Sequence, residues 1–327
     1  MNSLVFVLAV TFGSVALGYV TRLVPLGPLA GVTRNAATIS KVLKIVAIFV
    51  LNPVPVVNAF WRLSLDSGLL LVFPFLGIVS VTVAGSTAIG LNYLFGIPPR
   101  RAASVFVASA FTNIMSLGGL IAFVFFGHDG YALVPLFNSF ISLAYYAVGY
   151  PLSHHLSLEK SLETRGRVTF SSGVFRERPY LLSPVIAILF GLLLNVMGAP
   201  RPVRLDAVSG VLIPLISAII GYSIGLSLRF SRIRAYWKEI ALVSAVKFIV
   251  VPAVIIPIGV GLGLPSLLDG VAFKVLVVLS VMPVAFNALI PPVVYEFDLD
   301  LANSAWVVTT LAIIPLLPVL YVLLMLQ

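Results

Sequence analysis

Long apolar windows without Asp, Glu, Lys or Arg fill most of this chain. A helix crosses the hydrocarbon of a bilayer with about 20 mostly apolar residues, and most of the windows reach that length. The charge-free windows are 1–21, 45–61, 67–99, 102–127, 130–158, 179–200, 207–228 and 301–327, and two more, 240–268 and 270–295, are interrupted by Lys247 and Lys274. They lack the alternating pattern of barrel strands. The sequence therefore predicts an all-α polytopic membrane protein with ten transmembrane helices.

The composition excludes the soluble and enzymatic classes. Of the 327 residues, 9% are charged, against roughly 25% in soluble domains. The sequence has no cysteine, which excludes disulfides, thiolate metal sites and a cysteine nucleophile. His128, His154 and His155 fall at predicted loop positions, and no Asp or Glu lies deep in a window to pair with a serine. We therefore expect neither an enzyme nor a cofactor or metal.

The basic residues predict the orientation in the membrane. Lys and Arg concentrate in alternate connections, whereas the opposite set of connections carries Arg62, Arg201 and Arg204. By the positive-inside rule, the connections rich in Lys and Arg are cytoplasmic, so both termini lie outside the plasma (inner) membrane. Most of the net charge of +9 then belongs to cytoplasmic connections that lie against anionic lipid of the bilayer. We therefore expect no nucleic-acid partner.

A polar stretch near residues 152–180 divides the predicted spans into five and five. We expect a first repeat at 1–152, a cytoplasmic connecting loop at 153–180 and a second repeat at 181–327. An odd number of spans in each repeat inserts the second repeat upside down, an architecture common in secondary transporters. A short local sequence similarity favours this repeat. Asn113 follows Ala-Phe-Thr and Asn287 follows Val-Ala-Phe, and each Asn lies in the fourth span of its half.

The fourth and ninth spans are predicted to be broken near mid-membrane. Asn113 is followed by a Gly-Gly pair at 118–119. Asn287 is flanked by Pro283 and by a Pro-Pro pair at 291–292. Proline removes a backbone donor and glycine loosens a helix, and unwound backbone at that depth is tolerated where it is buried in protein or lines a wet cavity. Half-helix amino termini present free N–H groups and partial positive charge there, so the expected guest is an anion.

The candidate substrate-binding residues are the polar and helix-breaking residues at this depth, namely Asn113, Asn287, Pro283, Ser116, Lys247, Asn52 and Asn138. For Asn52, Asn138 and Ser217, helix packing or kink chemistry is the favoured interpretation. Tyr145 and Tyr146 are expected in the interfacial aromatic belt, with a pocket lining as the alternative. Lys247 has two interpretations: a fixed positive charge that attracts a carboxylate beside the broken helices, or a side chain that snorkels to the cytoplasmic interface.

The ninth predicted span contains Met282–Leu289, which is followed by Tyr295, Asp298, Leu301–Ala302 and Thr309–Thr310. This pattern resembles the auxin efflux carrier family of membrane transporters, and Lys247–Pro252 resembles the family's eighth helix. The resemblance implies breaks in spans 4 and 9, and an elevator-type core of spans 3–5 and 8–10 that moves against a scaffold of spans 1, 2, 6 and 7. It also implies a homodimer formed by the scaffold. Met115 and Leu120 stand where the family has a glycine and a proline, so we expect a milder break in span 4.

A secondary transporter of small organic anions is the leading functional hypothesis. The connecting loop lacks the long hydrophilic insert of plant auxin carriers, so the chain is more similar to bacterial members, which the resemblance associates with mono- or dicarboxylates such as malate or malonate. A sodium-coupled symporter of the bile-acid type is the alternative, because it shares the ten-span plan and sodium can be bound by backbone carbonyls. The missing deep carboxylates argue against that alternative.

Overall fold

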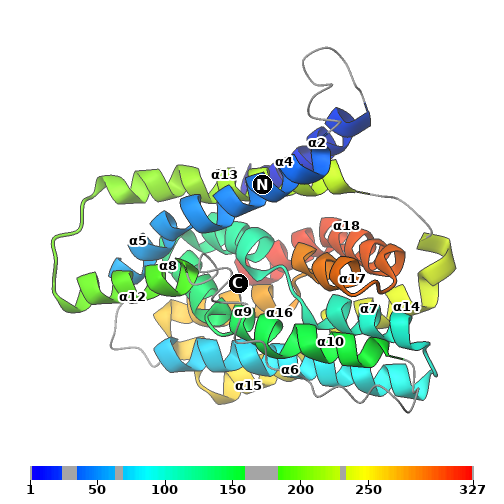
Figure 1. The fold of residues 1–327 in the computed structure, drawn as a ribbon. Helices are drawn as coiled ribbons and strands as arrows, with labels where there is room; N and C mark the ends of the chain where they lie inside the picture. The colour runs from blue at the N-terminus through cyan, green and yellow to red at the C-terminus, as the bar shows by residue number, and fades with distance from the viewer. Residues whose placement is uncertain (1, 24–34, 63–68, 159–182, 229–232, 326–327) are drawn as a thin grey trace.

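The computed structural model describes residues 2–23, 35–62, 69–158, 183–228 and 233–325, and these are helical nearly throughout (Figure 1). Within these ranges, seven helices are long and apolar enough to cross a membrane: Ser3–Leu23, Thr38–Arg62, Val72–Leu94, Ile114–Ser157, Arg204–Leu226, Ile233–Gly261 and Leu299–Met325. The prediction of an all-helical, multi-pass membrane protein is confirmed. The connecting loop predicted at 153–180 lies for the most part outside the described residues.

The other predicted spans are shorter or interrupted helices. The 44-residue stretch Ile114–Ser157 takes in parts of the fourth and fifth windows, with a kink at Gly127, where φ is 65° and ψ is −153°. The sixth window contains α12 (Ser183–Val196), and the ninth is divided between α16 (Val271–Ser280) and α17 (Ile290–Val294). The count of ten spans and the inverted relation of the two halves remain predictions.

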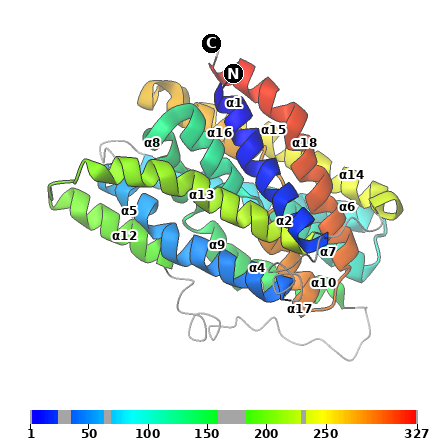
Figure 2. The same ribbon diagram turned by 90° about the horizontal axis from the view of Figure 1, so that it is seen from above.

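One group of helices is centred on α13 (Arg204–Ser227), which packs against α2 (Ser14–Leu23), α4 (Ala36–Ile45) and α5 (Pro53–Arg62). The π-helical turn η1 (Ala9–Gly13) joins α1 (Asn2–Leu8) to α2, and η3 (Val46–Leu51) follows α4. In both views α2 and α4 lie beside α13, and α12 lies beside α5 (Figure 1, Figure 2). These helices come from the predicted spans 1, 2, 6 and 7.

Glycines bring α2 and α13 into backbone contact. A Cβ added at Gly18 would lie 2.1 Å from the carbonyl oxygen of Tyr222, and one added at Gly225 would lie 2.1 Å from the carbonyl oxygen of Val15. Small residues allow helices in membranes to approach this closely, where van der Waals packing replaces the hydrophobic effect as the driving force. The first predicted span therefore packs tightly against the seventh.

The remaining helices form a second group. They are α6 (Leu69–Leu94), α7 (Pro99–Ala110), α8 (Gly119–Asn138), α9 (Ile141–Ala144), α10 (Tyr150–Ser157), α14 (Trp237–Ala245), α15 (Val251–Gly261), α16, α17 and α18 (Leu299–Met325). The side chain of Arg101 on α7 forms ion pairs with Glu239 on α14 and with Asp298, just before α18. The two groups meet where α8 packs against α5 and α13.

The outer surface is apolar, as a lipid-facing surface must be. On α12 alone, Ile186 and Leu189 are each 60% exposed, and Phe190 and Leu193 are more than half exposed. Soluble monomers rarely expose contiguous apolar patches larger than a few hundred Å². Exposed leucine and valine side chains also occur on α2, α13 and α18, so the burial pattern agrees with the membrane assignment.

Candidate functional site

Both predicted breaks are present. Helix α7 begins with Pro99 in its first turn, where proline is favoured, and ends at Ala110. Residues 111–113 are not helical, and the π-helical turn η4 (Ile114–Gly118) then leads into α8. Helix α16 ends at Ser280, and residues 281–285 separate it from the 3₁₀ turn η11 (Phe286–Leu289). The break in the fourth predicted span is the shorter of the two.

The two breaks cross each other and pair through their backbones. Thr112 and Val284 form an isolated antiparallel bridge. The N–H of Asn113 donates to the carbonyl of Pro283, and the N–H of Ala285 donates to the carbonyl of Phe111, both at 2.9 Å. We call residues 111–113 and 281–285 the crossing. Each unwound segment thus supplies hydrogen-bond partners to the other inside the protein, where Phe111 and Val284 are fully buried.

Two hydroxyl groups satisfy further backbone groups of the crossing. The Tyr145 hydroxyl accepts from the N–H of Thr112 at 2.8 Å and donates to the carbonyl of Ala110 at 3.2 Å. The Thr309 hydroxyl accepts from the N–H of Val284 at 3.2 Å. Buried main-chain groups outside a helix need such partners, so side chains from the predicted spans 5 and 10 hold the crossing in place.

The expected interfacial position of Tyr145 is wrong. Its side chain is 2% exposed, and its ring stacks on Phe111 with the centroids 4.0 Å apart. A belt tyrosine keeps its hydroxyl in the wet headgroup region, whereas this hydroxyl replaces the helix hydrogen bonds that the break removes. The Tyr145 side chain therefore supports the crossing from within the protein.

Lys247 points into the crossing. It lies on the π-helical turn η8 (Val246–Val250) and is 1% exposed. Its Nζ donates to the carbonyl of Phe111 at 3.0 Å and to the hydroxyl of Thr112. Among the described residues, no Asp or Glu forms an ion pair with this ammonium. The snorkelling interpretation is wrong, because the side chain is held by oxygen atoms of the break.

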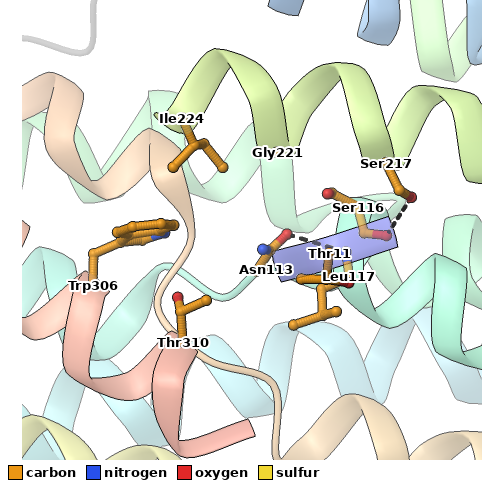
Figure 3. Close-up of a pocket in the computed structure, with 9 residues that line it drawn as sticks. All are labelled: Thr11, Asn113, Ser116, Leu117, Ser217, Gly221, Ile224, Trp306 and Thr310. Atoms are coloured by element: carbon orange, nitrogen blue, oxygen red, sulfur yellow. Dashed lines mark hydrogen bonds between the residues drawn. The ribbon is translucent and has the colours of Figure 1, made fainter. Parts of the chain in front are cut away.

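A small cavity lies between the two groups of helices, beside the crossing (Figure 3). Its walls come from η1, from η4 and the residue before it, from α13 and from α18, and the lining residues are Thr11, Asn113, Ser116, Leu117, Ser217, Gly221, Ile224, Trp306 and Thr310. No Asp or Glu is among them. The cavity has a volume of about 20 Å³, which is room for one water molecule. A larger guest requires the two groups of helices to separate.

Polar atoms without partners face this cavity. Trp306 Nε1, Thr310 Oγ1 and Thr11 Oγ1 are buried and have no hydrogen-bond partner among the described residues. The Asn113 side-chain oxygen accepts from the N–H of Leu117 at 3.4 Å, and its amide nitrogen points to the side of Trp306 and Thr310 (Figure 3). Buried polar groups are normally paired, and an indole N–H is a donor only. The set therefore fits a polar guest that accepts hydrogen bonds.

The structure brings some of the predicted site residues together. Asn113 and Ser116 line the cavity. Pro283 belongs to the crossing, and Lys247 contacts it. Asn287 lies in η11, beyond the crossing, and does not line the cavity. Its Oδ1 is buried and has no partner among the residues that the structure describes.

The other two predicted residues lie elsewhere in the fold. Asn52 Oδ1 accepts from the Tyr131 hydroxyl at 3.1 Å, which ties the second predicted span to the fifth. Asn138 Nδ2 donates to the Ser142 hydroxyl at 3.3 Å, across the short interruption between α8 and α9. Both contacts are the packing or kink chemistry that the sequence favours for these residues.

Sequence reasoning did not single out Thr11 or Trp306, and it treated Ser217 as packing. The Ser217 hydroxyl donates to the carbonyl of Ser116 at 3.0 Å, so it does bridge the two groups of helices. The sequence gives no signal for Trp306, because it is the sixth residue of the last apolar window and lies near the end where membrane tryptophans concentrate. Thr310 belongs to the Thr-Thr pair of the family resemblance.

No known family model matches this sequence. The chain is 27% identical over 309 residues to an uncharacterized transporter from Methanothermobacter thermautotrophicus, and the alignment covers 93% of each protein. The similarity thus extends over nearly the whole chain and includes both groups of helices. The resemblance to the auxin efflux carrier family remains a prediction from the motif residues.

Proposed function

We propose that this chain is a secondary transporter of small organic anions, such as mono- or dicarboxylates, in the plasma membrane. The observation that carries the proposal is the unpaired set of Trp306 Nε1, Thr310 Oγ1 and Thr11 Oγ1 in a cavity beside two interrupted helices. The similarity to a transporter over nearly the whole chain supports transport as the activity. The broken helices support it too, because substrate sites in such proteins are formed by discontinuous helices.

The electrostatics of the cavity favour an anion. The turn after Asn113 is the amino terminus of a half-helix, which carries partial positive charge and leaves its first N–H groups without helical partners. Lys247 Nζ contacts Thr112, the residue before Asn113, so its charge acts at short range through a medium of low dielectric constant. No Asp or Glu lines the cavity to oppose these groups. A substrate carboxylate would accept hydrogen bonds from Asn113, Trp306 and Thr310.

Alternating access would come from relative movement of the two groups of helices. The cavity has room for one water molecule in this conformation, and its walls belong to both groups, so moving the second group against α13 would open it. We assign the ten predicted spans to two inverted repeats, 1–152 and 181–327, joined by a cytoplasmic loop at 153–180, with both termini outside. This elevator-type scheme moves the crossing and its bound anion together across the membrane.

Uptake by proteoliposomes tests the proposal. Purified protein is reconstituted, and the entry of labelled mono- and dicarboxylates of three to six carbons is compared with that of neutral and cationic solutes of similar size. Asn113→Asp keeps the shape of the side chain but adds a negative charge, so it should abolish uptake of the transported anion. Transport of a cation or neutral solute but of no carboxylate would refute anion transport.

A matched pair of threonines tests the cavity. Thr310→Val removes the unpaired hydroxyl without changing the shape of the side chain, and it should weaken anion transport. Thr82→Val removes a hydroxyl that donates to the carbonyl of Ile78 in its own helix, on an exposed part of α6, and should transport normally. Equal loss in both variants would assign the effect to helix stability and remove Thr310 from the site.

A further inference from the structure

The surroundings of the Lys247 ammonium have the composition of a cation site. Its Nζ contacts a main-chain carbonyl oxygen from the unwound segment, at Phe111, and a hydroxyl oxygen, at Thr112. In transporters with interrupted helices, unwound carbonyls and half-helix carboxyl ends are the groups that coordinate the coupling cation. Here the ligand of those oxygen atoms is an amine of the protein itself.

The position also favours positive charge. Phe111 directly follows the last residue of α7, so its carbonyl lies at the negative end of the helix dipole. The same carbonyl accepts from the N–H of Ala285, which belongs to the other break. The ammonium therefore contacts one of the two carbonyl oxygens that accept a backbone hydrogen bond between the breaks. It is 1% exposed and is not among the residues that line the cavity, so a cavity guest does not displace it.

We propose that Lys247 is a tethered monovalent cation, which completes the crossing in the way that a bound sodium or potassium ion would. Burial of a charged amine is costly in a membrane, and the oxygen atoms of the break offset that cost. The crossing then needs no metal cation, and sodium has no vacant position there. The proposed function also uses the charge of Lys247, but the inference concerns the crossing and can be tested without a transported anion, so the two can fail separately.

Thermal unfolding of the purified protein in detergent tests this directly. The wild-type melting temperature should be the same in sodium, potassium and choline chloride at equal concentration, because choline is too large to enter a cation site. A saturable stabilisation by sodium over choline would overturn the proposal. This arm needs no substrate and no variant, so it decides the question even if a substitution at Lys247 prevents folding.

Chemical rescue provides the second arm. Lys247→Ala should melt at a lower temperature and leave an oxygen-lined space, and methylammonium, ethylammonium or sodium should raise its melting temperature saturably, while choline should not. Lys247→Met fills the same space without a charge, so none of these cations should stabilise it. Lys274→Ala, in the partly exposed outer turn of α16, is the matched control and should not respond. An Ala variant that folds but shows no specific response to small cations would contradict a tethered-cation role.

Transport adds an independent readout. If a carboxylate is transported by the wild type, its uptake rate should be equal with sodium and with choline outside. A sodium requirement would overturn the tethered cation and support a sodium-coupled symporter. If no carboxylate is transported at all, the proposed function fails, whereas the unfolding measurements still decide the role of Lys247.

Discussion

Tyr145→Phe isolates the hydroxyl that serves the shorter break. The substitution keeps the ring and therefore its stacking on Phe111, with centroids 4.0 Å apart. It removes the acceptor for the N–H of Thr112 and the donor to the carbonyl of Ala110. Neither backbone group can turn to a helical partner, because the chain leaves the helix between them. The variant thus tests hydrogen bonding at the crossing without a change in packing.

The magnitude follows from two competing estimates. A buried donor or acceptor left without a partner costs about 1–3 kcal/mol. Side-chain hydrogen bonds between membrane helices are worth about 0.6 kcal/mol on average and at most about 1.7, because the partners find substitutes. The N–H of Thr112 and the carbonyl of Ala110 have few alternative partners, because the neighbouring backbone groups of the crossing already form hydrogen bonds with each other. We therefore expect a loss of about 2 kcal/mol in the free energy of unfolding, within the range for an unpaired buried group and above the usual value for side-chain bonds between membrane helices.

The measurement is reversible unfolding in mixed micelles, by titration with a denaturing detergent. Tyr93→Phe removes the same hydroxyl from a side chain that is 90% exposed and should change the free energy of unfolding by less than about 0.5 kcal/mol. If Tyr145→Phe also loses less than about 0.5 kcal/mol, the hydroxyl does not support the crossing, and the reasoning from unsatisfied backbone groups is wrong.

Three further substitutions have clear expectations. Gly18→Ala should lower the free energy of unfolding by more than about 1 kcal/mol, because its Cβ would lie 2.1 Å from a carbonyl oxygen of α13. A Cβ added at Gly90 meets nothing within 4 Å, so Gly90→Ala should be neutral or stabilising by up to about 1 kcal/mol. Similar thermal unfolding of the two variants would contradict the close packing of α2 and α13. Trp306→Phe removes an unpaired buried N–H, so it should raise the KM for the anion about tenfold, equivalent to about 1.4 kcal/mol of binding, without lowering the melting temperature; an unchanged KM would remove the indole from the site. Arg62→Gln breaks ion pairs with Asp129 at 3.1 Å and with Asp206 at 3.9 Å. Both are solvent-accessible, so the free energy of unfolding should change by less than about 1 kcal/mol; a larger loss would show a structural role for the Arg62 guanidinium.

The sequence by itself determined the features that depend on local chemistry. Apolar windows of membrane length predict helices because each helix satisfies its own backbone hydrogen bonds. The breaks follow from Pro283 and from the glycines after Asn113, which act on the turns next to them. The expected depth of Lys247 follows from its position inside an apolar window, 240–268, that is otherwise free of Asp, Glu, Lys and Arg after Glu239. These predictions need no knowledge of which helix lies beside which.

Tertiary structure alone decided how these features are combined. Asn113 pairs with Pro283, which is distant in sequence, and the cavity unites Thr11, Trp306 and Ser116 from three separate helical segments. Successive residues of a helix point in directions about 100° apart, so a small rotation of a helix decides whether Lys247 or Tyr145 faces lipid, an interface or a break. That rotation is set by packing, as at the glycine contacts of α2 and α13. In lipid, both faces of a helix are apolar, so the hydrophobic pattern that reveals the inward face of a soluble helix is missing.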